Sequence, residues 1–337
     1  MRTARNEASI SDAFRELLHT LSSTSAILDI HFVTGTASAV FAAATSTGSI
    51  GIYQLETPSS APVDAPTLHH METVQYGPED VLVTALSWHP DGCEFGITLS
   101  NGDVKLGRTF YGSSRSKLKN KRVMTHDLEA WTTVFFSDGS GMLSGGDDRA
   151  LRFTELPQSP MDCYEDLVPP QYAPWRKPRW TDTKIHRAGV TAILPVYWDE
   201  ASTLIVTGSY DDHIRLINAH TIGHREVLAE LNLGGGVWRL KVLSKMNAPR
   251  TRRRWHTWDS DPYPEQMLLL VSCMHAGVRV VKLACIENTW RFEVQAKFEE
   301  HKSMNYGSDS QPDSDDRGRR TFISTSFYDR LLCLWRY

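Results

Sequence analysis

Two short stretches of the sequence contain residue types that can carry out acid–base and nucleophilic chemistry. Cys273 and His275 lie in one stretch, and Gly235, Gly236 and Arg239 lie in the other. Histidine is the usual general base at neutral pH because its ordinary pKa lies near that pH. Backbone N–H groups of the two glycines, or the Arg239 guanidinium, would stabilise a developing oxyanion. These residue types are suited to acid–base catalysis with His275 as the base, with Cys273 as a candidate nucleophile.

The same residues also have structural interpretations, which the sequence leaves open. Cys273 is either a nucleophile or a buried structural thiol. His275 is either a catalytic base or a hydrogen-bonded turn residue, and Gly234–Gly236 is either a close backbone approach or a plain loop. The sequence contains no G-x-S-x-G nucleophile elbow, no P-loop and no strong metal signature. We expect no metal site and no cofactor.

The elements that position these residues belong to an internal repeat. Its clearest copy has an apolar strand from Thr203 to Val206, a polar turn at Ser209–Asp212 and then a second alternating strand. This pattern predicts a β-hairpin. Six copies can be counted, with equivalent turn positions at Thr47, Asn101, Asp148, Asp211, His275 and Asp329. Small antiparallel sheets that recur in this way predict an all-β, WD-repeat β-propeller.

WD repeats commonly carry a histidine that hydrogen-bonds to the turn aspartate of the same blade. Three repeats have such a pair, namely His126 with Asp148, His186 with Asp211 and His301 with Asp329. We expect these residues to be structural. In the repeat that contains His275, the marker histidine position is Leu233 and the turn aspartate is replaced by His275 itself. The repeat therefore does not account for this imidazole, which makes it the strongest catalytic candidate.

A further repeat position, five residues after the marker histidine, begins the innermost strand. It is occupied by Ser25, Thr84, Trp131, Thr191, Trp238 and Tyr306 in chain order. Side chains at this position are expected to point to the mouth of the central channel. The three aromatic rings are predicted either to form a cage for a quaternary ammonium group, with Glu129 adding negative charge, or to pack between blades.

The repeats predict how the chain is divided. Residues 1–24 are expected to form an N-terminal arm with a short helix over Asp12–Leu21, and residues 25–337 a single propeller. Loop insertions, rich in Pro, Ser, Gly or charge, are predicted near 57–66, 112–122, 158–178, 248–264 and 307–319. A seven-bladed ring is typical of this repeat type. Either the ring consists of six full repeats, or an N-terminal blade is reduced or absent. We favour the second alternative, with the ring closed by other segments.

Composition limits the class of protein. Hydrophobic residues make up 41% of the chain, and its net charge is −4, which argues against nucleic acid as a direct partner. The basic run Arg250–Arg254 is interpreted as a solvated loop. The five cysteines lack zinc spacing, which indicates reduced thiols. With neither a signal peptide nor about 18 consecutive apolar residues, the sequence predicts a cytoplasmic protein without a membrane span.

Several segments together resemble the diphthine methyl ester hydrolases, the WD-repeat enzymes of diphthamide biosynthesis. The most specific are Gly234–Arg239, which reads Gly-Gly-Gly-Val-Trp-Arg, and Cys273–His275, which reads Cys-Met-His. The others are Thr24–Asp29, Glu129–Trp131, Ser144–Asp148, Thr207–Asp211 and Ser326–Asp329. The resemblance runs from about Thr24 to Trp335.

The resemblance implies an activity and a partner. The substrate would be a histidine of translation elongation factor 2, extended by a group with a trimethylammonio function and a carboxyl methyl ester. Hydrolysis of the ester would give diphthine. The alternative is a non-catalytic WD-repeat scaffold that assembles other proteins. Release of methanol from the methylated factor would distinguish the two.

Overall fold

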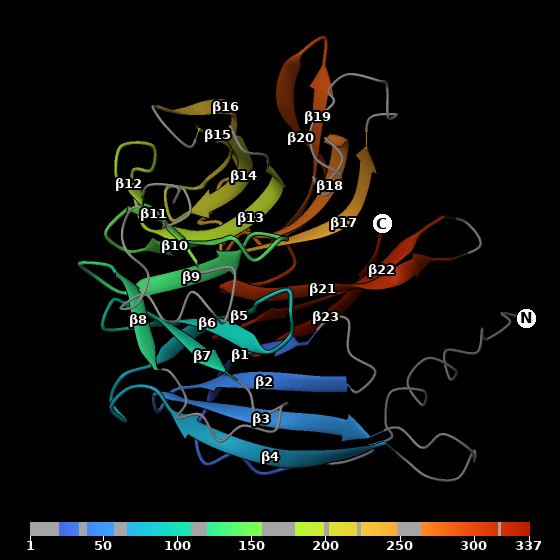
Figure 1. The fold of residues 1–337 in the computed structure, drawn as a ribbon. Helices are drawn as coiled ribbons and strands as arrows, with labels where there is room; N and C mark the ends of the chain where they lie inside the picture. The colour runs from blue at the N-terminus through green and yellow to red at the C-terminus, as the bar shows by residue number, and fades with distance from the viewer. Residues whose placement is uncertain are drawn as a thin grey trace, which may run out of the picture.

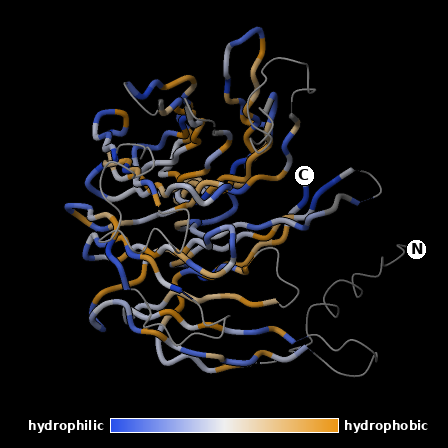
Figure 2. Tube along the Cα trace, in the orientation of Figure 1, coloured by the Kyte–Doolittle hydropathy of each residue, from blue (hydrophilic) through white to orange (hydrophobic). Residues whose placement is uncertain are grey.

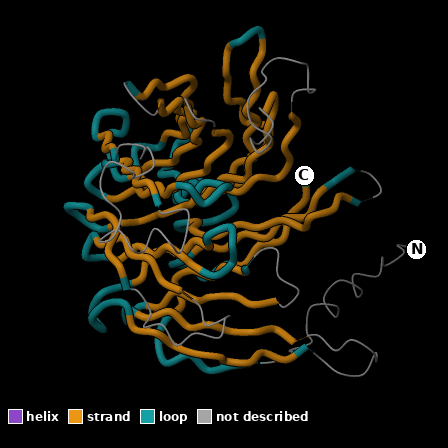
Figure 3. Tube along the Cα trace, viewed as in Figure 1, coloured by secondary structure: helices purple, strands orange, loops and turns teal. Residues whose placement is uncertain are grey.

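The computed structural model of the protein describes nine stretches of the chain. They are residues 20–33, 39–56, 66–108, 120–156, 179–198, 202–220, 224–247, 264–315 and 318–337. Every regular element within them is a β-strand, as Figure 3 shows. The strands form six separate antiparallel sheets arranged around a common axis (Figure 1). The predicted all-β WD-repeat propeller is therefore confirmed, with six blades in the described part of the chain rather than seven.

The first three sheets are four-stranded meanders, which we name blades A, B and C. Blade A consists of β1 (Ile27–Phe32), β2 (Ala39–Thr45), β3 (Ser49–Glu56) and β4 (Thr67–Gln75). Blade B consists of β5 (Val83–Trp88), β6 (Glu94–Leu99), β7 (Asp103–Arg108) and β8 (Lys121–Thr125). Blade C consists of β9 (Ala130–Phe135), β10 (Gly141–Gly146), β11 (Leu151–Glu155) and β12 (Trp180–Asp182).

Blades D and E also have four strands, and blade F has three in the described residues. Blade D consists of β13 (Val190–Trp198), β14 (Ser202–Ser209), β15 (His213–His220) and β16 (Arg225–Asn232). Blade E consists of β17 (Arg239–Asn247), β18 (Pro264–Ser272), β19 (Val278–Ile286) and β20 (Thr289–Phe298). Blade F consists of β21 (Asn305–Ser314), β22 (Arg320–Ser326) and β23 (Leu332–Arg336).

All six predicted turns lie between the second and third strands of a blade. In blade B this turn ends at Gly102, where φ is +88° and a Cβ would lie 2.3 Å from the backbone oxygen of His126. Only glycine combines such a backbone with so close an approach. The turn therefore fixes the second hairpin of blade B against the chain that enters blade C.

Blade A is a complete four-stranded sheet, whereas blade F has three strands in the described residues. The fate of a further N-terminal blade stays a prediction, because residues 1–19 lie outside the described residues. One expectation about the C-terminal part of the chain needs correction. Residues 307–314, predicted as part of a loop insertion, belong to β21, because Gly307–Ser310 pair with β22 and the pairing resumes at Ser314 after an irregularity. The other four predicted insertions, the helix predicted over Asp12–Leu21 and the basic run Arg250–Arg254 fall wholly or mostly outside the described residues.

Apolar side chains between neighbouring blades form the core. The largest cluster joins blades D and E through residues such as Val206, Leu216, Leu269 and Val281, all of which are fully buried. Figure 2 shows apolar stretches along the inner strands and hydrophilic stretches at the outer turns. Because each blade covers the face of the next, the packing fixes the angle between adjacent sheets.

The first strand of each sheet contacts the first strand of the next, in the order β1, β5, β9, β13, β17 and β21. These innermost strands therefore line the axis of the ring. Among the described strands, blades F and A, the two ends of the series, share no comparable contact. Apolar side chains remain exposed on both, including Ile30 and Phe32 on β1 and Leu332 and Leu334 on β23.

Candidate functional site

Aromatic side chains gather where the innermost strands begin. Trp131 lies at the start of β9, Trp238 directly precedes β17, and Tyr306 lies at the start of β21. The ring centroids of Trp131 and Trp238 are 5.6 Å apart, and those of Trp238 and Tyr306 are 5.0 Å apart. All three side chains are partly exposed. The structure thus brings together the three rings that the repeat alignment singled out, although their role in binding stays a prediction.

Blade D contributes a fourth ring from a different position. Its residue at the aligned position, Thr191, is buried and donates a hydrogen bond to the Val237 carbonyl. Tyr210, in the turn after β14, instead contacts Trp131 at 6.3 Å and Trp238 at 5.9 Å between centroids. We call Trp131, Tyr210, Trp238 and Tyr306 the aromatic cluster. The alignment missed the role of Tyr210 in this cluster because the residue lies on a turn.

Two carboxylates from blade C adjoin the aromatic cluster. The indole N–H of Trp131 donates to Oδ1 of Asp147 at 3.4 Å, and the Asp147 N–H donates to the Glu129 carbonyl at 2.8 Å. Neither carboxylate forms an ion pair with any residue that the structure describes. Burial, and then the charges of Asp147 and Glu129, raise the pKa of Tyr210 well above its usual value. Tyr210 is therefore a neutral phenol, and both acids lie within its electrostatic range.

Arg239, predicted as an oxyanion donor, is held in an ion pair. Its Nη2 lies 3.2 Å from Oδ1 of Asp29, which belongs to β1 of blade A. Oδ2 of Asp29 also accepts a hydrogen bond from the N–H of Leu86 at 3.0 Å and lies 3.2 Å from Nε2 of His31. Burial alone would raise the pKa of Asp29, but the Arg239 charge and these hydrogen bonds keep it below its usual value. The pair links blades A and E and leaves no net charge there.

The glycine stretch lies against the turn that contains His275. A Cβ at Gly235 would lie 2.4 Å from the Cys273 carbonyl oxygen and 2.8 Å from the Ala276 side chain. Only glycine allows the two segments to approach so closely. Within the described residues, the N–H groups of Gly235 and Gly236 meet no hydrogen-bond acceptor, so both remain free to donate.

Cys273 is unsuited to the role of nucleophile. Its side chain is completely buried in the core between blades D and E. Burial raises the pKa of the Cys273 thiol to about 12, so the reactive thiolate does not form near neutral pH. The structural interpretation of this residue is the one that the geometry supports.

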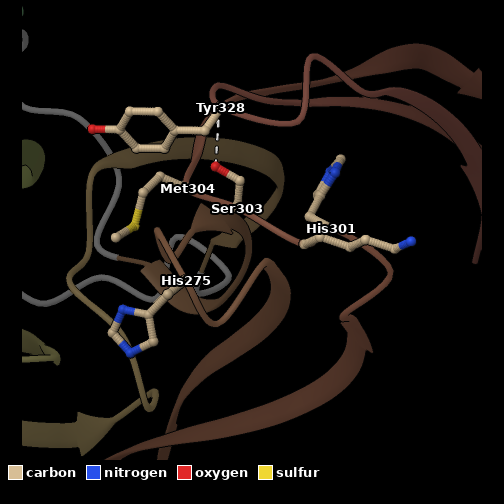
Figure 4. A pocket seen from close by; sticks show the side chains of 6 residues that line it. His275, His301, Ser303, Met304 and Tyr328 are labelled. Carbon is tan, nitrogen blue, oxygen red and sulfur yellow. Dashed lines mark hydrogen bonds between the residues drawn. The ribbon is translucent and has the colours of Figure 1, made fainter.

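His275, in contrast, is exposed and forms no hydrogen bond or ion pair with the described residues. It borders a pocket of about 350 Å³ at the junction of blades E and F, lined also by His301, Lys302, Ser303, Met304 and Tyr328. In Figure 4, His275, Met304 and Tyr328 extend to one side of the view, whereas His301 lies on the other.

The pocket is connected to the aromatic cluster. The rings of Tyr306 and Phe327 lie 6.0 Å apart, and those of Phe327 and Tyr328 lie 5.1 Å apart. Tyr328 lines the pocket beside His275. A ligand in the cluster could therefore extend toward the imidazole along these aromatic side chains.

The three marker histidines are structural, although only one forms the predicted bond. Nδ1 of His126 lies 2.8 Å from Oδ1 of Asp148. His186 and His301 instead contact the hydroxyl groups of Thr207 at 2.9 Å and Ser324 at 2.8 Å. In those two blades the turn aspartates, Asp211 and Asp329, accept hydrogen bonds from the backbone N–H groups of Arg187 and Lys302, the residues after each histidine.

The described residues include no cluster of three or more His, Cys, Asp or Glu side chains that would hold a metal ion. The described part of the chain also has no helix long and apolar enough to cross a membrane.

Comparisons with known proteins agree with the fold and point to one family. Residues 178–218 match the model of the WD domain, G-beta repeat. The chain is 30% identical over 314 residues to the diphthine methyltransferase of Schizosaccharomyces pombe, covering 92% of this chain and 78% of that protein. It is 26% identical to the diphthine methyltransferase homolog of Dictyostelium discoideum, covering 76% and 63%, respectively. It is 30% identical to the diphthine methyltransferase of Saccharomyces cerevisiae, covering 62% and 49%.

Two solved structures share the architecture. Chaetomium thermophilum Sqt1, bound to the N-terminus of the ribosomal protein L10, superposes with a TM-score of 0.59 at 11% identity and covers 94% of this chain and 73% of that one. A chain of the mitotic checkpoint complex superposes with a TM-score of 0.56 at 16% identity, covering 95% and 77%. At these identities the likeness extends to the fold alone.

Proposed function

The chain belongs to the diphthine methyltransferase family, and we propose that it hydrolyses the methyl ester of methylated diphthine on translation elongation factor 2. Water attacks the ester carbonyl, the bond between the carbonyl carbon and the methoxy oxygen breaks, and the products are diphthine and methanol. The diphthine part of this proposal is based on the names of the relatives. The ester is based on the resemblance of the sequence motifs. The elongation factor is a cytoplasmic protein substrate in this proposal, with no direct contact to nucleic acid.

The aromatic cluster is the observation that supports this proposal. Four rings from four different blades meet at one end of the axis, with Asp147 and Glu129 beside them. A quaternary ammonium group cannot donate hydrogen bonds, so it is recognised by aromatic faces and negative charge. Each aromatic contact contributes about 0.5–2 kcal/mol. The trimethylammonio group of methylated diphthine has this chemistry.

His275 would act as the base in the hydrolysis. Its exposed imidazole accepts a proton from the attacking water, and the N–H groups of Gly235 and Gly236 stabilise the oxyanion that forms. The methoxide then takes up the proton and leaves as methanol. The contact of Gly235 with Cys273 and Ala276 supports this division of roles, because His275 belongs to the same turn.

The test is methanol release from purified elongation factor 2 that carries methylated diphthine, without any added methyl donor. The native chain should release one methanol per ester. His275→Ala should lower turnover by about 100-fold, the scale of lost acid–base catalysis, while the protein stays folded. Binding of the factor without methanol release would instead favour the scaffold function, and a requirement for S-adenosylmethionine would contradict hydrolysis.

The aromatic cluster is tested in the same assay. Trp238→Ala should raise KM for the trimethylated substrate much more than for an analogue with an unmethylated amine, because only the quaternary group depends on the rings. Trp180→Ala, which removes a half-buried ring from β12, is the control and should leave KM unchanged. Equal effects of Trp238→Ala on both substrates would remove the cage from the proposal.

A further inference from the structure

The charges around the aromatic cluster are unbalanced. Asp147 and Glu129 are half-buried and have no ion-pair partner among the described residues. Arg239, which directly follows Trp238, is neutralised by Asp29. The cluster therefore lies beside two negative charges that form no ion pair with a cation in the described part of the chain.

The position of Gly189 brings one of these charges close to a ring. A Cβ on Gly189 would lie 2.6 Å from Oδ1 of Asp147 and 3.0 Å from Cδ2 of Tyr210. The missing side chain thus lets the carboxylate and the phenol ring approach each other from blades C and D. A cation held by the rings would lie next to the Asp147 carboxylate.

We infer that Asp147 and Glu129 make the aromatic cluster select the methyl ester over the free acid. This inference rests on the proposed function. In the ester form, the modified side chain carries one positive charge, on its quaternary ammonium group. After hydrolysis it carries an additional carboxylate and is zwitterionic.

The physical basis is simple electrostatics between charges that are only partly exposed to water. Both carboxylates attract the ammonium group in substrate and product alike, but they repel only the carboxylate of the product. The aromatic rings do not distinguish the two forms. Asp147 and Glu129, which we call the acidic pair, therefore weaken the binding of the product selectively. This promotes product release and limits inhibition by product.

Two small ligands isolate this effect from catalysis. Acetonyltrimethylammonium and glycine betaine both carry a trimethylammonio group, and they differ in having a methyl group or a negatively charged oxygen on the carbonyl carbon. Neither can be hydrolysed. Calorimetric titration of the full chain should show the ketone binding more tightly than the betaine, on the order of tenfold, as two partly solvated charges would produce.

Charge-removing variants identify the residues responsible. Asp147→Asn combined with Glu129→Gln keeps the side-chain shapes and should bring the ratio of the two affinities close to one. Asp147→Glu should retain the preference for the ketone. Glu293→Gln, an exposed acid on β20, is the matched control and should leave the ratio unchanged.

The two possible failures can be told apart. Equal affinity of the native chain for both ligands, or a ratio that persists in the double variant, would overturn the role of the acidic pair. Binding of neither ligand, with no response to Trp238→Ala, would overturn the aromatic cage of the proposed function, and with it this inference. Because the ligands are inert, neither result depends on turnover.

Discussion

Histidines of this chain fall into two groups with different chemistry. His126, His186 and His301 are buried and hydrogen-bonded within their blades, as the repeat predicts for a structural position. His275 occupies a turn where the repeat normally has an aspartate, and it is exposed without a partner among the described residues. The sequence could separate these groups because a break in a repeat marks a residue that the fold does not require.

His186 should make stability depend on pH in a definite direction. Burial lowers its pKa to about 4, from the ordinary 6.5, so the unfolded chain binds a proton first as the pH falls. The stability that its neutral ring contributes is complete above about pH 6.5. It is lost progressively as the pH falls to about 4, by up to ~3 kcal/mol.

Urea unfolding at pH 7 and pH 4.5 measures this effect. His186→Gln should lose less stability between the two pH values than the native chain, since glutamine does not titrate. His275→Gln, at an exposed position, is the control and should follow the native chain. The same pH dependence in all three proteins would show that His186 is not the titrating group.

At the scale of elements, the sequence was informative about hairpins and much less so about sheet edges. All six turns lie between the second and third strands because Gly, Asn and Asp provide the backbone geometry that these turns need. Residues 307–314, rich in Gly, Ser and Asp, were predicted as a loop and form β21. Pairing with β22 decides their conformation, and strand formation depends more on such partners than on intrinsic preference.

The junction between blades D and E should be sensitive to a single methyl group. A Cβ at Gly208, on β14, would lie 2.3 Å from Cγ1 and 2.8 Å from Cβ of Val237. Gly208→Ala should therefore destabilise the protein by about 1–3 kcal/mol, the usual cost of overpacking. It should also move Tyr210 relative to Trp238, which would be detected as a change in tryptophan fluorescence.

Gly307→Ala is the matched control for this prediction. Gly307 also lies in a strand, and a Cβ there would meet only the Thr325 hydroxyl, at 3.1 Å. It should change stability and fluorescence little. Native-like unfolding of Gly208→Ala would show that the two blades can separate without loss of packing.

At the scale of the whole molecule, the sequence predicts six repeats but not how the first and last blades contact each other. Trp131, Trp238 and Tyr306 could be identified because they occupy one repeat position and all innermost strands start at the same end. Tyr210 could not be identified in this way, because it lies in a turn of blade D. At the aligned repeat position, blade D has Thr191 instead of an aromatic residue. Closure of the ring depends on contacts between the two ends of the chain, for which local pattern carries no signal.

In the described part of the chain, blades F and A share no strand contact comparable to those between the other neighbouring blades, and this affects the order in which the molecule opens. Blades that are supported only by their neighbours behave like a linear array, in which units with one neighbour are the least protected. Amide hydrogens of blades A and F should exchange first, and those of blades C and D last. Exchange measured by mass spectrometry would show this gradient, and uniform protection around the ring would contradict it. Tyr306, on blade F, would then be the first member of the aromatic cluster to detach, so ligands that bind the cluster should slow exchange most in β21.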